Sequence, residues 1–453
     1  MKKQWGYAAF TALILLLCLV PSVGMLFARQ AQTGGNEVLA PLPTLRDREG
    51  RLNTGYLSDL REYAEDNYFL RQHFVTAWSA LNHRGLRTSI AGNVLLGRDG
   101  WLYFADTLDD YTGANPMDER EIFSAARNLA LMEEYCRSQG AQFLFAVAPN
   151  KNSVYPEHMP PLPVFSQESN RDAVGRALAE SFVPYLDLSA AFDSREEVLY
   201  FTQDSHWNSQ GAALAADWIN AALHRDAPRY FYGGVFTPAA DHRSDLYDML
   251  YPAGAWLETD QKYAGALVFD YDAPIRDATS MTILTTGEGR GSLLMFRDSF
   301  GNLLYPYLAD SFAHALFSRS VDYRLHLTAQ QAADCVVVEL VERNLDYLIE
   351  NVPVMPAPVR EAPAAGRTLE AVPALDTEAA RDLEGYVLVR GTLPAEPAGD
   401  SPVLLCAASV WYEAFLLEDG GFALYLPEEA LFSGSPTLAF TAADGAVSTP
   451  AVL

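Results

Sequence analysis

Between residues 120 and 340, short apolar runs alternate with segments of helical composition, and this alternation constrains the fold more than any other feature. Runs such as Phe143-Leu144-Phe145-Ala146-Val147-Ala148 are typical of strands buried on both faces. Helices are expected near 120–139, 170–182 and 209–223, and strands at 143–148, 183–188, 281–284, 293–296, 313–317 and 336–340. The pattern predicts an α/β domain with a parallel sheet covered on both faces, and reactive groups at the carboxyl ends of its strands.

The first 29 residues are typical of a targeting segment. Residues 5–28 carry no charged side chain, and Lys2 and Lys3 precede them. As a helix these residues span roughly 36 Å, which exceeds a hydrocarbon core of about 30 Å. We expect residues 1–29 to be an uncleaved signal anchor with the lysines in the cytoplasm, and a cleaved signal peptide is the alternative. Either interpretation places the rest of the chain outside the cytoplasm, membrane-bound in the first case and secreted in the second.

The remaining sequence divides by composition. Residues 30–55 are polar and contain Pro and Gly, which predicts a stalk, and residues 56–352 contain the α/β domain. That domain is expected to open with a helix within 56–90, followed by a hairpin turn at Asp99-Gly100.

The C-terminal part has a different composition. Residues 353–366 are rich in Pro and Ala and are expected to form a linker. Residues 367–453 alternate strand-like segments with Pro, Gly and Asp turns, which predicts a small β-sandwich-like domain. Its aromatic residues Trp411, Tyr412 and Phe415 are expected in its core, and a platform on which glycan rings stack is the alternative.

Charge and cysteine spacing exclude several classes of function. The 453 residues carry a net charge of −26, which argues against binding of nucleic acid and against adhesion to anionic lipid through a basic surface. The four cysteines form no CxxC or Cys/His ligand pattern, so we predict no metal site and no cofactor.

A candidate nucleophile follows one of the buried runs. The run at 293–296 ends in Asp298-Ser299, and Gly301 follows. A serine at the start of a helical turn lies where backbone N–H groups point outward and can hold a developing oxyanion. A serine before a helix is also a common N-cap, so this motif alone leaves both interpretations open.

A second motif supplies the other groups that serine catalysis requires. Asp204 and His206 are two residues apart, and such positions project to the same face of an extended backbone. Asp204 can therefore orient the imidazole of His206 while the other ring nitrogen faces the Ser299 hydroxyl. The alternative is that His206 is a packed surface histidine and Asp204 a helix cap.

The block Asp204-Ser205-His206-Trp207-Asn208, with Gly211 shortly after, resembles the Asp-x-His-Trp signature of the DHHW family and the related alginate O-acetyltransferase proteins. The resemblance covers roughly residues 55–350 and not the C-terminal domain. Further blocks agree in the same order, at 97–103, Pro149-Asn150-Lys151 with Tyr155-Pro156, Asp298-Ser299-Phe300-Gly301-Asn302 with Tyr305-Pro306, Asp322-Tyr323-Arg324, and 341–344.

This resemblance implies an SGNH-hydrolase-like, three-layer α/β/α domain in which the Asp-His pair precedes the serine. It implies Ser299 as nucleophile, His206 as general base and Asp204 as the orienting carboxylate. It also places four residues near the substrate, namely Tyr305, Arg324, Asn208 and Lys151. Arg297 stands where many SGNH enzymes have glycine, and the glycine and asparagine that complete their oxyanion hole have no assigned match.

These features lead to a primary hypothesis and two alternatives. The primary one is O-acyl transfer, chiefly of acetyl, to hydroxyls of a cell-surface or exported polysaccharide through acyl-Ser299. On resemblance alone, the acyl donor is a polytopic membrane acyltransferase. The first alternative is a carbohydrate esterase or deacetylase with the same triad, and the second is a non-catalytic scaffold of an exopolysaccharide export complex. No residue in the sequence separates transfer from hydrolysis.

Overall fold

The structure, a computed structural model, describes residues 2–25, 27, 39–46, 49–166, 168–193, 195–369, 373–431, 436–442 and 444–452. Helix α1 (Lys2–Gly24) contains the segment Trp5–Gly24, which is long and apolar enough to cross a membrane and is almost entirely exposed. The expected boundary at residue 29, and residues 30–38 and 47–48 of the predicted stalk, 30–55, lie outside the described residues.

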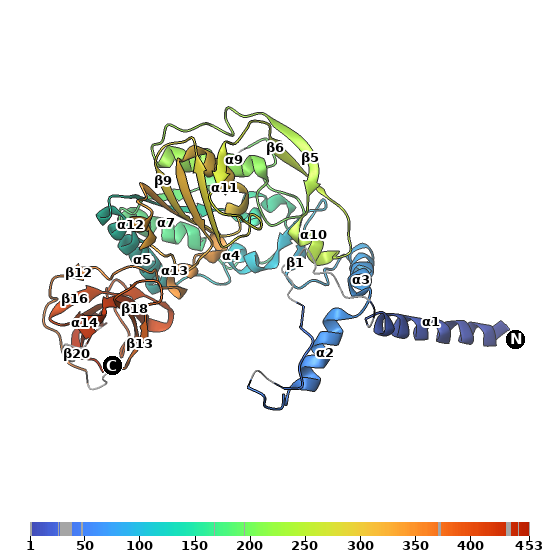
Figure 1. The fold of residues 1–453 in the computed structure, drawn as a ribbon, viewed down its shortest axis with the longest axis horizontal. Coiled ribbons are helices and arrows are strands. Elements are labelled where there is room, and N and C mark those ends of the chain that lie inside the picture. The colour runs from blue at the N-terminus through green and yellow to red at the C-terminus, as the bar shows by residue number, and fades with distance from the viewer. Residues whose placement is uncertain are drawn as a thin grey trace.

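A seven-stranded sheet forms the centre of the main domain (Figure 1). Its strands lie in the order β4 (Tyr185–Asp187), β3 (Gln142–Ala148), β11 (Cys335–Val341), β9 (Ser292–Phe296), β10 (His314–Ser318), β8 (Thr282–Gly287) and β7 (Phe269–Tyr271). The first five strands pair in parallel, so the predicted α/β fold is confirmed.

The prediction of an entirely parallel sheet is wrong at one edge. Strand β8 runs antiparallel to β10, and β7 runs antiparallel to β8. Only residues 288–291 separate β8 from β9. A crossover between parallel strands needs a dozen or more residues, so β8 cannot join β9 in parallel, and β10 lies between them.

Helices cover both faces of this sheet, and alternate residues of β3 contribute to the two cores. Phe143, Phe145 and Val147 pack with α5 (Glu119–Ser138), α7 (Asn170–Glu180) and α13 (Tyr347–Glu350). Leu144, Ala146 and Ala148 pack with α8 (Ser189–Phe192), α9 (Ser209–Ala222) and α11 (Gly301–Ser311). Shorter turns complete the domain at η1 (Ala105–Thr107), α4 (Leu108–Thr112), α6 (Lys151–Val154), η2 (Pro156–His158), α12 (Leu327–Gln330) and η3 (Glu342–Asn344).

The region before the sheet differs in part from expectation. Two helices, α2 (Tyr56–Asn67) and α3 (Arg71–Leu86), replace the single helix predicted within 56–90. Tyr68 is extended and Leu70 has a φ of 65°, so the helical hydrogen bonds stop between them. The predicted hairpin is confirmed, because β1 (Val94–Leu96) pairs with β2 (Leu102–Phe104) and Asp99 and Gly100 both have positive φ.

An insertion between α9 and the sheet's β7 edge contributes to the site. It contains the two-stranded sheet of β5 (Phe236–His242) and β6 (Glu258–Tyr263), with α10 (Asp245–Leu250) between the two strands. Helix α10 contacts α3 as well as β1 and β2.

Two antiparallel sheets form the C-terminal unit and share one hydrophobic core. Tyr412 and Phe415 are buried, whereas Trp411 is half-buried. One sheet has the order β12 (Val359–Arg360), β16 (Val410–Glu413), β15 (Leu404–Ala407), β19 (Thr437–Ala442), β20 (Gly445–Pro450). The other has the order β13 (Leu375–Ala379), β14 (Tyr386–Thr392), β18 (Gly421–Pro427), β17 (Phe415–Leu416), and the turns η4 (Glu418–Gly420) and α14 (Glu428–Leu431) flank β18.

Residues 353–366, expected as a linker, are partly built into this unit. Val359 and Arg360 form β12, whose partner strand is β16. Val354 and Met355 are buried in the core of the main domain. The Pro-rich composition hides both roles, because β12 has only two residues and therefore no alternation to detect.

The two units are joined by a buried polar contact as well as by apolar packing. The Asn128 amide on α5 donates to the Leu416 carbonyl at 2.8 Å and accepts from the Leu416 N–H at 2.9 Å. Glu413 accepts from Arg127 at 2.6 and 2.7 Å and from Arg360 at 2.6 Å. These contacts fix the C-terminal unit against α5.

Candidate active site

Ser299, His206 and Asp204 lie in one continuous hydrogen-bonded line. His206 Nε2 is 2.8 Å from Ser299 Oγ, and His206 Nδ1 is 2.7 Å from Asp204 Oδ1. Ser299 follows β9 immediately before α11, and the other two residues lie in the loop before α9. Asp204 is 3% exposed, whereas Ser299 and His206 are half-buried. This order of groups is the one that activates a serine for acyl transfer.

Asp204 is held as an ionised carboxylate by four donors. Its Oδ1 also accepts the His206 backbone N–H at 3.0 Å, and its Oδ2 accepts from His242 Nε2 and from the Asp245 N–H, each at 2.9 Å. Burial acts to raise the pKa of Asp204, but the hydrogen bonds and charges of His206 and His242 hold it well below its usual range. Burial also acts to lower the pKa of His206, yet Asp204 raises it above the ordinary value.

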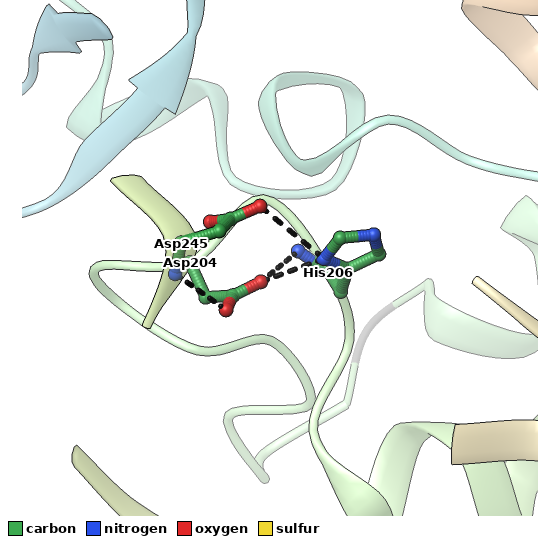
Figure 2. Close-up of side chains that lie close together, drawn as sticks. All are labelled: Asp204, His206 and Asp245. Atoms are coloured by element: carbon green, nitrogen blue, oxygen red, sulfur yellow. Dashed lines mark hydrogen bonds and ion pairs between the residues drawn. The ribbon is translucent and has the colours of Figure 1, made fainter. Parts of the chain in front are cut away.

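Figure 2 shows a second carboxylate, that of Asp245, on the same side of the His206 ring as Asp204. Its Oδ2 is 3.5 Å from His206 Nδ1 and accepts from the Ser205 hydroxyl at 2.5 Å. Burial and the nearby Asp204 charge raise the pKa of Asp245 to about 6. The other ring nitrogen of His206 points away from both carboxylates, toward Ser299.

The three side chains of Figure 2 also have the spacing of a metal site, because their ligand atoms lie within 4.8 Å of one another. Hydrogen bonds already engage both carboxylates, however. Asp245 Oδ1 accepts from the backbone N–H groups of Ser205 and Leu246, and Asp204 has the four donors described above. We therefore interpret the cluster as a hydrogen-bonded acid–base network.

The turn that carries Ser299 is fixed on both sides. Asp298 accepts from the N–H groups of Phe300 and Val341, each at 2.8 Å, which ties the turn to the end of β11. Trp207 is fully buried and donates from its indole nitrogen to the Phe300 carbonyl at 3.0 Å. The tryptophan next to His206 therefore connects the histidine loop directly to the serine turn.

Buried charges hold the loop that carries Asp204 and His206. On β6, Glu258 accepts from the Thr202 N–H and hydroxyl at 2.5 and 2.6 Å, and Asp260 accepts from the Ser209 N–H and hydroxyl at 3.0 and 2.6 Å. The Lys151 ammonium donates to the carbonyls of Leu102, Thr202 and Asp204 at 2.7, 2.7 and 3.0 Å. Burial lowers the pKa of Lys151 to about 7.

The four residues expected near the substrate occupy different environments. Lys151 is buried under the loop, and the Asn208 side chain caps α9 by accepting from the N–H groups of Gln210 and Gly211. Tyr305 is buried in α11 and bonds to the Tyr271 hydroxyl at 2.8 Å. Arg324 is half-exposed and pairs with Asp382 of the C-terminal unit at 3.3 Å. Of these four residues, Lys151 bonds to a member of the candidate triad, through the Asp204 carbonyl.

Arg297, the residue that stands in place of glycine, is also buried. Its guanidinium donates to Asn302 Oδ1 at 2.6 Å and to the Ala278 carbonyl at 2.7 Å, and its pKa is lowered to about 10 by burial. The aliphatic part of the side chain packs against Gly301, where a Cβ would lie 2.5 Å from Arg297 Cδ. Gly301 therefore makes room for the arginine at the start of α11.

Sequence reasoning missed His242 and Asp245. They lie 36 and 39 residues after His206, in the insertion around β5 and α10, and no spacing connects them to the Asp-x-His-Trp motif. The strand pattern over 236–242 is short, and its only chemical signal is a histidine followed three residues later by an aspartate. The fold alone brings both residues to Asp204.

Part of this chain is similar to known proteins. Residues 94–261 match a family model described as an SGNH hydrolase-like domain, acetyltransferase AlgX. The match includes Asp204 and His206 and ends before Ser299. A probable alginate O-acetylase AlgJ of Pseudomonas syringae pv. tomato is 25% identical over 183 residues, which cover 39% of this chain and 45% of the relative. The corresponding protein of Pseudomonas fluorescens is 25% identical over 207 residues, which cover 43% of this chain and 50% of the relative. The chain thus spans about half the length of these curated relatives.

Three solved structures resemble about half of this chain, each with a TM-score below 0.5. For Bacillus cereus PatB1, the TM-score is 0.43 and the sequence identity is 18%. This match covers 56% of this chain and 96% of the PatB1 chain. For a DHHW family protein from Eubacterium siraeum, the TM-score is 0.39 and the sequence identity is 15%. This match covers 51% of this chain and 90% of the DHHW protein. For the O-acetyltransferase domain of Pseudomonas putida AlgJ, the TM-score is 0.38 and the sequence identity is 17%. This match covers 57% of this chain and 93% of the AlgJ domain.

The sequence matches and the order of the motif blocks agree. The chain is thus similar to the AlgX-type SGNH hydrolase-like domain and to the AlgJ proteins, which confirms the resemblance found in its sequence.

Proposed function

We propose that this protein is an SGNH-type O-acyltransferase that passes an acetyl group through acyl-Ser299 to a hydroxyl of a polysaccharide. The observation that carries the proposal is the unbroken line Asp204–His206–Ser299, with contacts of 2.7 and 2.8 Å. The sequence similarity to alginate O-acetylases supports the acetyl group and the class of acceptor. Because the chain covers only half of those relatives, the activity itself is part of the proposal.

The chemistry follows from the positions of the three side chains. Ser299 Oγ attacks the carbonyl carbon of the acyl donor while His206 Nε2 accepts its proton, and Asp204 stabilises the imidazolium. The leaving group departs with that proton and leaves acyl-Ser299. A sugar hydroxyl then transfers its proton to His206 and attacks the acyl carbon. Ser299 leaves with the returned proton, and the sugar ester is released.

The start of α11 supplies the stabilisation of the oxyanion in this proposal. Within the described residues, the Phe300 N–H is occupied by Asp298, whereas the Ser299 N–H has no acceptor. The Ser299 N–H and the positive end of the α11 dipole therefore face the developing charge. The two terminal nitrogens of the Arg297 guanidinium are occupied, because they donate to Asn302 Oδ1 and to the Ala278 carbonyl.

The N-terminal helix supports a location at a membrane. We place α1 in the membrane, with the catalytic domain on the extracytoplasmic side, where exported polysaccharide is accessible. The acyl donor on that side would be a polytopic membrane acyltransferase. The C-terminal residues 367–453 would form a β-sandwich-like module that binds glycan or a partner protein, with half-buried Trp411 as its accessible aromatic side chain.

The experiment that tests the proposal is intact-mass measurement of the full chain in detergent after brief incubation with an activated acetyl ester. We expect one added acetyl group on the wild type and none on Ser299→Ala. Ser138→Ala is the matched control, because Ser138 is exposed on α5 and its loss leaves the triad intact. Release of the ester's leaving group is followed in the same sample, so that fast deacylation is also detected.

A second measurement separates transfer from hydrolysis. With an oligosaccharide present, transfer yields an acetylated sugar, whereas a carbohydrate esterase yields free acetate. Folded protein that gives neither adduct nor leaving group would refute the catalytic proposal. The non-catalytic scaffold would then be the better interpretation.

A further inference from the structure

One helix of the main domain presents an apolar face to solvent. On α3, Phe74, Trp78 and Leu81 recur at spacings of four and three residues, so they lie on one side of the helix. Their exposed fractions are 36%, 57% and 62%. Ala77, on the same face, is also exposed. A cluster of large exposed apolar side chains on a single face marks an interaction surface.

The opposite face of α3 is fixed to the catalytic domain, so the apolar face is not free to turn inward. Ser79 is buried on this face. The Thr76 hydroxyl accepts the Ala253 N–H at 2.9 Å, and the His83 ring bonds to the Tyr251 hydroxyl. These contacts join α3 to the segment that follows α10.

The charge around α3 differs from that of the whole chain. No acidic residue occurs between Asp66 and Asp99, although the net charge of the chain is −26. The same stretch contains four arginines, and Arg84 and Arg87, at the end of α3, are exposed. The net charge argues against basic adhesion by the protein as a whole, but this helix is a local exception.

The apolar helix α1 joins the domain beside α3. The Phe69 N–H donates to the Pro21 carbonyl at 3.3 Å, and the Phe69 ring lies where a Cβ on Gly24 would be, 2.5 Å from Cδ1. Figure 1 shows α3 lying crosswise to α1, close to the end of α1 that meets the domain. A helix crosswise to a membrane-spanning helix lies parallel to the membrane plane.

We propose that the face of α3 formed by Phe74, Trp78 and Leu81 lies in the headgroup region of an anionic lipid bilayer, with Arg84 and Arg87 bound to lipid phosphates. A helix with aromatic and aliphatic residues on one face and arginines beside them has the composition of an interfacial helix. Tryptophan is enriched at the same depth. The bilayer is the occupant that the adjacent, exposed and apolar α1 supports.

This contact would also fix the distance of the active site from the membrane. Helix α10 contacts α3, and its first residue, Asp245, donates its N–H to Asp204. The triad therefore lies one helix away from the proposed lipid-binding face. The proposal does not depend on the acyltransferase assignment, because lipid contact is measured without any catalytic readout.

The test uses the full chain, reconstituted into vesicles, with its four cysteines replaced by alanine and a polarity-sensitive fluorophore at Leu81→Cys. Phe182→Cys is the matched control, because Phe182 is 90% exposed in the turn after α7. The vesicles contain phosphatidylcholine with or without phosphatidylglycerol, together with a nitroxide on the lipid headgroup. We expect quenching at residue 81 to exceed quenching at residue 182 several-fold, and to be strongest with phosphatidylglycerol.

The double variant Arg84→Glu/Arg87→Glu tests the charge contribution separately. We expect it to reduce quenching at residue 81 in anionic vesicles while ester turnover, measured on the same sample, stays unchanged. Quenching at residue 81 no greater than at residue 182 would overturn the proposal and indicate a protein partner for this face. Quenching that is independent of lipid charge would overturn the assignment of anionic lipid.

Discussion

His242 is the residue whose contribution the structure makes most specific. Its Nε2 lies 2.9 Å from Asp204 Oδ2, and its ring stacks on Phe201 at 3.6 Å between centroids. His242→Leu would leave a buried carboxylate oxygen with one donor fewer, at a cost of about 1.5–3 kcal/mol. Because this loss disturbs Asp204 and not the bound substrate, we expect kcat to fall about 10- to 100-fold with KM unchanged.

The control for this prediction is His242→Gln, whose amide N–H can still donate to Asp204. We expect it to recover most of the activity in the same steady-state assay. If Leu and Gln at this position gave equal rates, the hydrogen bond would have no part in catalysis and His242 would serve only to pack against Phe201.

The pH dependence of catalysis should be set by His206 and modified by Asp245. In the proposed mechanism neutral His206 is the base, and its pKa lies above the ordinary value because Asp204, and to a smaller extent Asp245, outweigh the effect of burial. The value of kcat/KM should therefore fall as pH decreases through a pKa above about 6.5. The neighbouring Asp245, with a pKa of about 6, titrates in the same range, so the profile reports the coupled pair.

The variant Asp245→Asn tests the direction in which the acid limb of kcat/KM shifts with pH. It removes a negative charge 3.5 Å from His206 Nδ1, which makes the imidazolium less stable. The acid limb of kcat/KM should shift to lower pH by about half a unit to one unit. Asp241→Asn, at an exposed position near Lys262, should leave the limb in place. A limb that moved to higher pH in Asp245→Asn would contradict the assignment.

The candidate triad was predictable from sequence because its residue types are few and their local contexts are distinctive. Ser299 follows a buried run, and Asp204 and His206 share one motif. The groups that tune the triad could not be predicted from the sequence, because Asp245 and His242 approach it only through tertiary contacts. Lys151 illustrates the same limit, since a lysine beside a motif gives no sign that its ammonium is buried against three carbonyls.

At the scale of elements, Asn208 acts as the N-cap of α9, and this role predicts a change in stability and not in substrate binding. Its side chain accepts from the N–H groups of Gln210 and Gly211 at 3.1 and 2.9 Å and donates to the Val198 carbonyl at 2.7 Å. Asn208→Ala should lower the free energy of unfolding by about 1–2 kcal/mol, measured by urea denaturation. Asn208→Asp keeps the capping oxygen, so its free energy of unfolding should fall by less than that of Asn208→Ala.

The same variants decide whether Asn208 also binds substrate. If Asn208 acts only as a helix cap, the KM of folded Asn208→Ala for the acceptor sugar should equal that of the wild type. A KM several-fold higher, with Asn208→Asp behaving likewise, would instead support a direct contact with substrate.

Most of the main domain was predictable at this scale, because buried parallel strands and their helices leave long, regular patterns. The edge strands were not. Phe269–Tyr271 has only three residues, and the run at 281–284 has the same apolar character whether its strand is parallel or antiparallel. The available signal was the eight residues, 285–292, between the predicted strands at 281–284 and 293–296, because a parallel crossover needs a dozen or more.

At the scale of the whole molecule, α1 and the C-terminal unit lie at opposite ends of the long axis in Figure 1. The main domain therefore separates the apolar helix from the C-terminal unit. If α1 and α3 face a membrane, the C-terminal unit faces away from it. This arrangement would place residues 367–453 where extended polymers and partner proteins have access.

The contact that maintains this arrangement centres on Glu413. Its carboxylate is 1% exposed and binds Arg127 and Arg360, whose side chains are 34% and 23% exposed. Glu413→Gln would leave two arginines short of their acceptor at the boundary between the units. Because both arginines retain some solvent, we expect the free energy of unfolding to fall by about 2–3 kcal/mol, below the largest values for fully buried pairs.

Urea denaturation monitored by site-resolved labelling of the Cys406 thiol, in β15 of the C-terminal unit, and by ester turnover in the main domain would measure this change in the two units separately. Glu378→Gln is the control, because its pair with Arg381 is largely exposed and should contribute less than about 0.5 kcal/mol. If the C-terminal unit depends on α5 for its position, the two probes should shift together in Glu413→Gln. A loss of stability in one probe alone would mean that the two units fold independently, and that the orientation of residues 367–453 is not fixed by this contact.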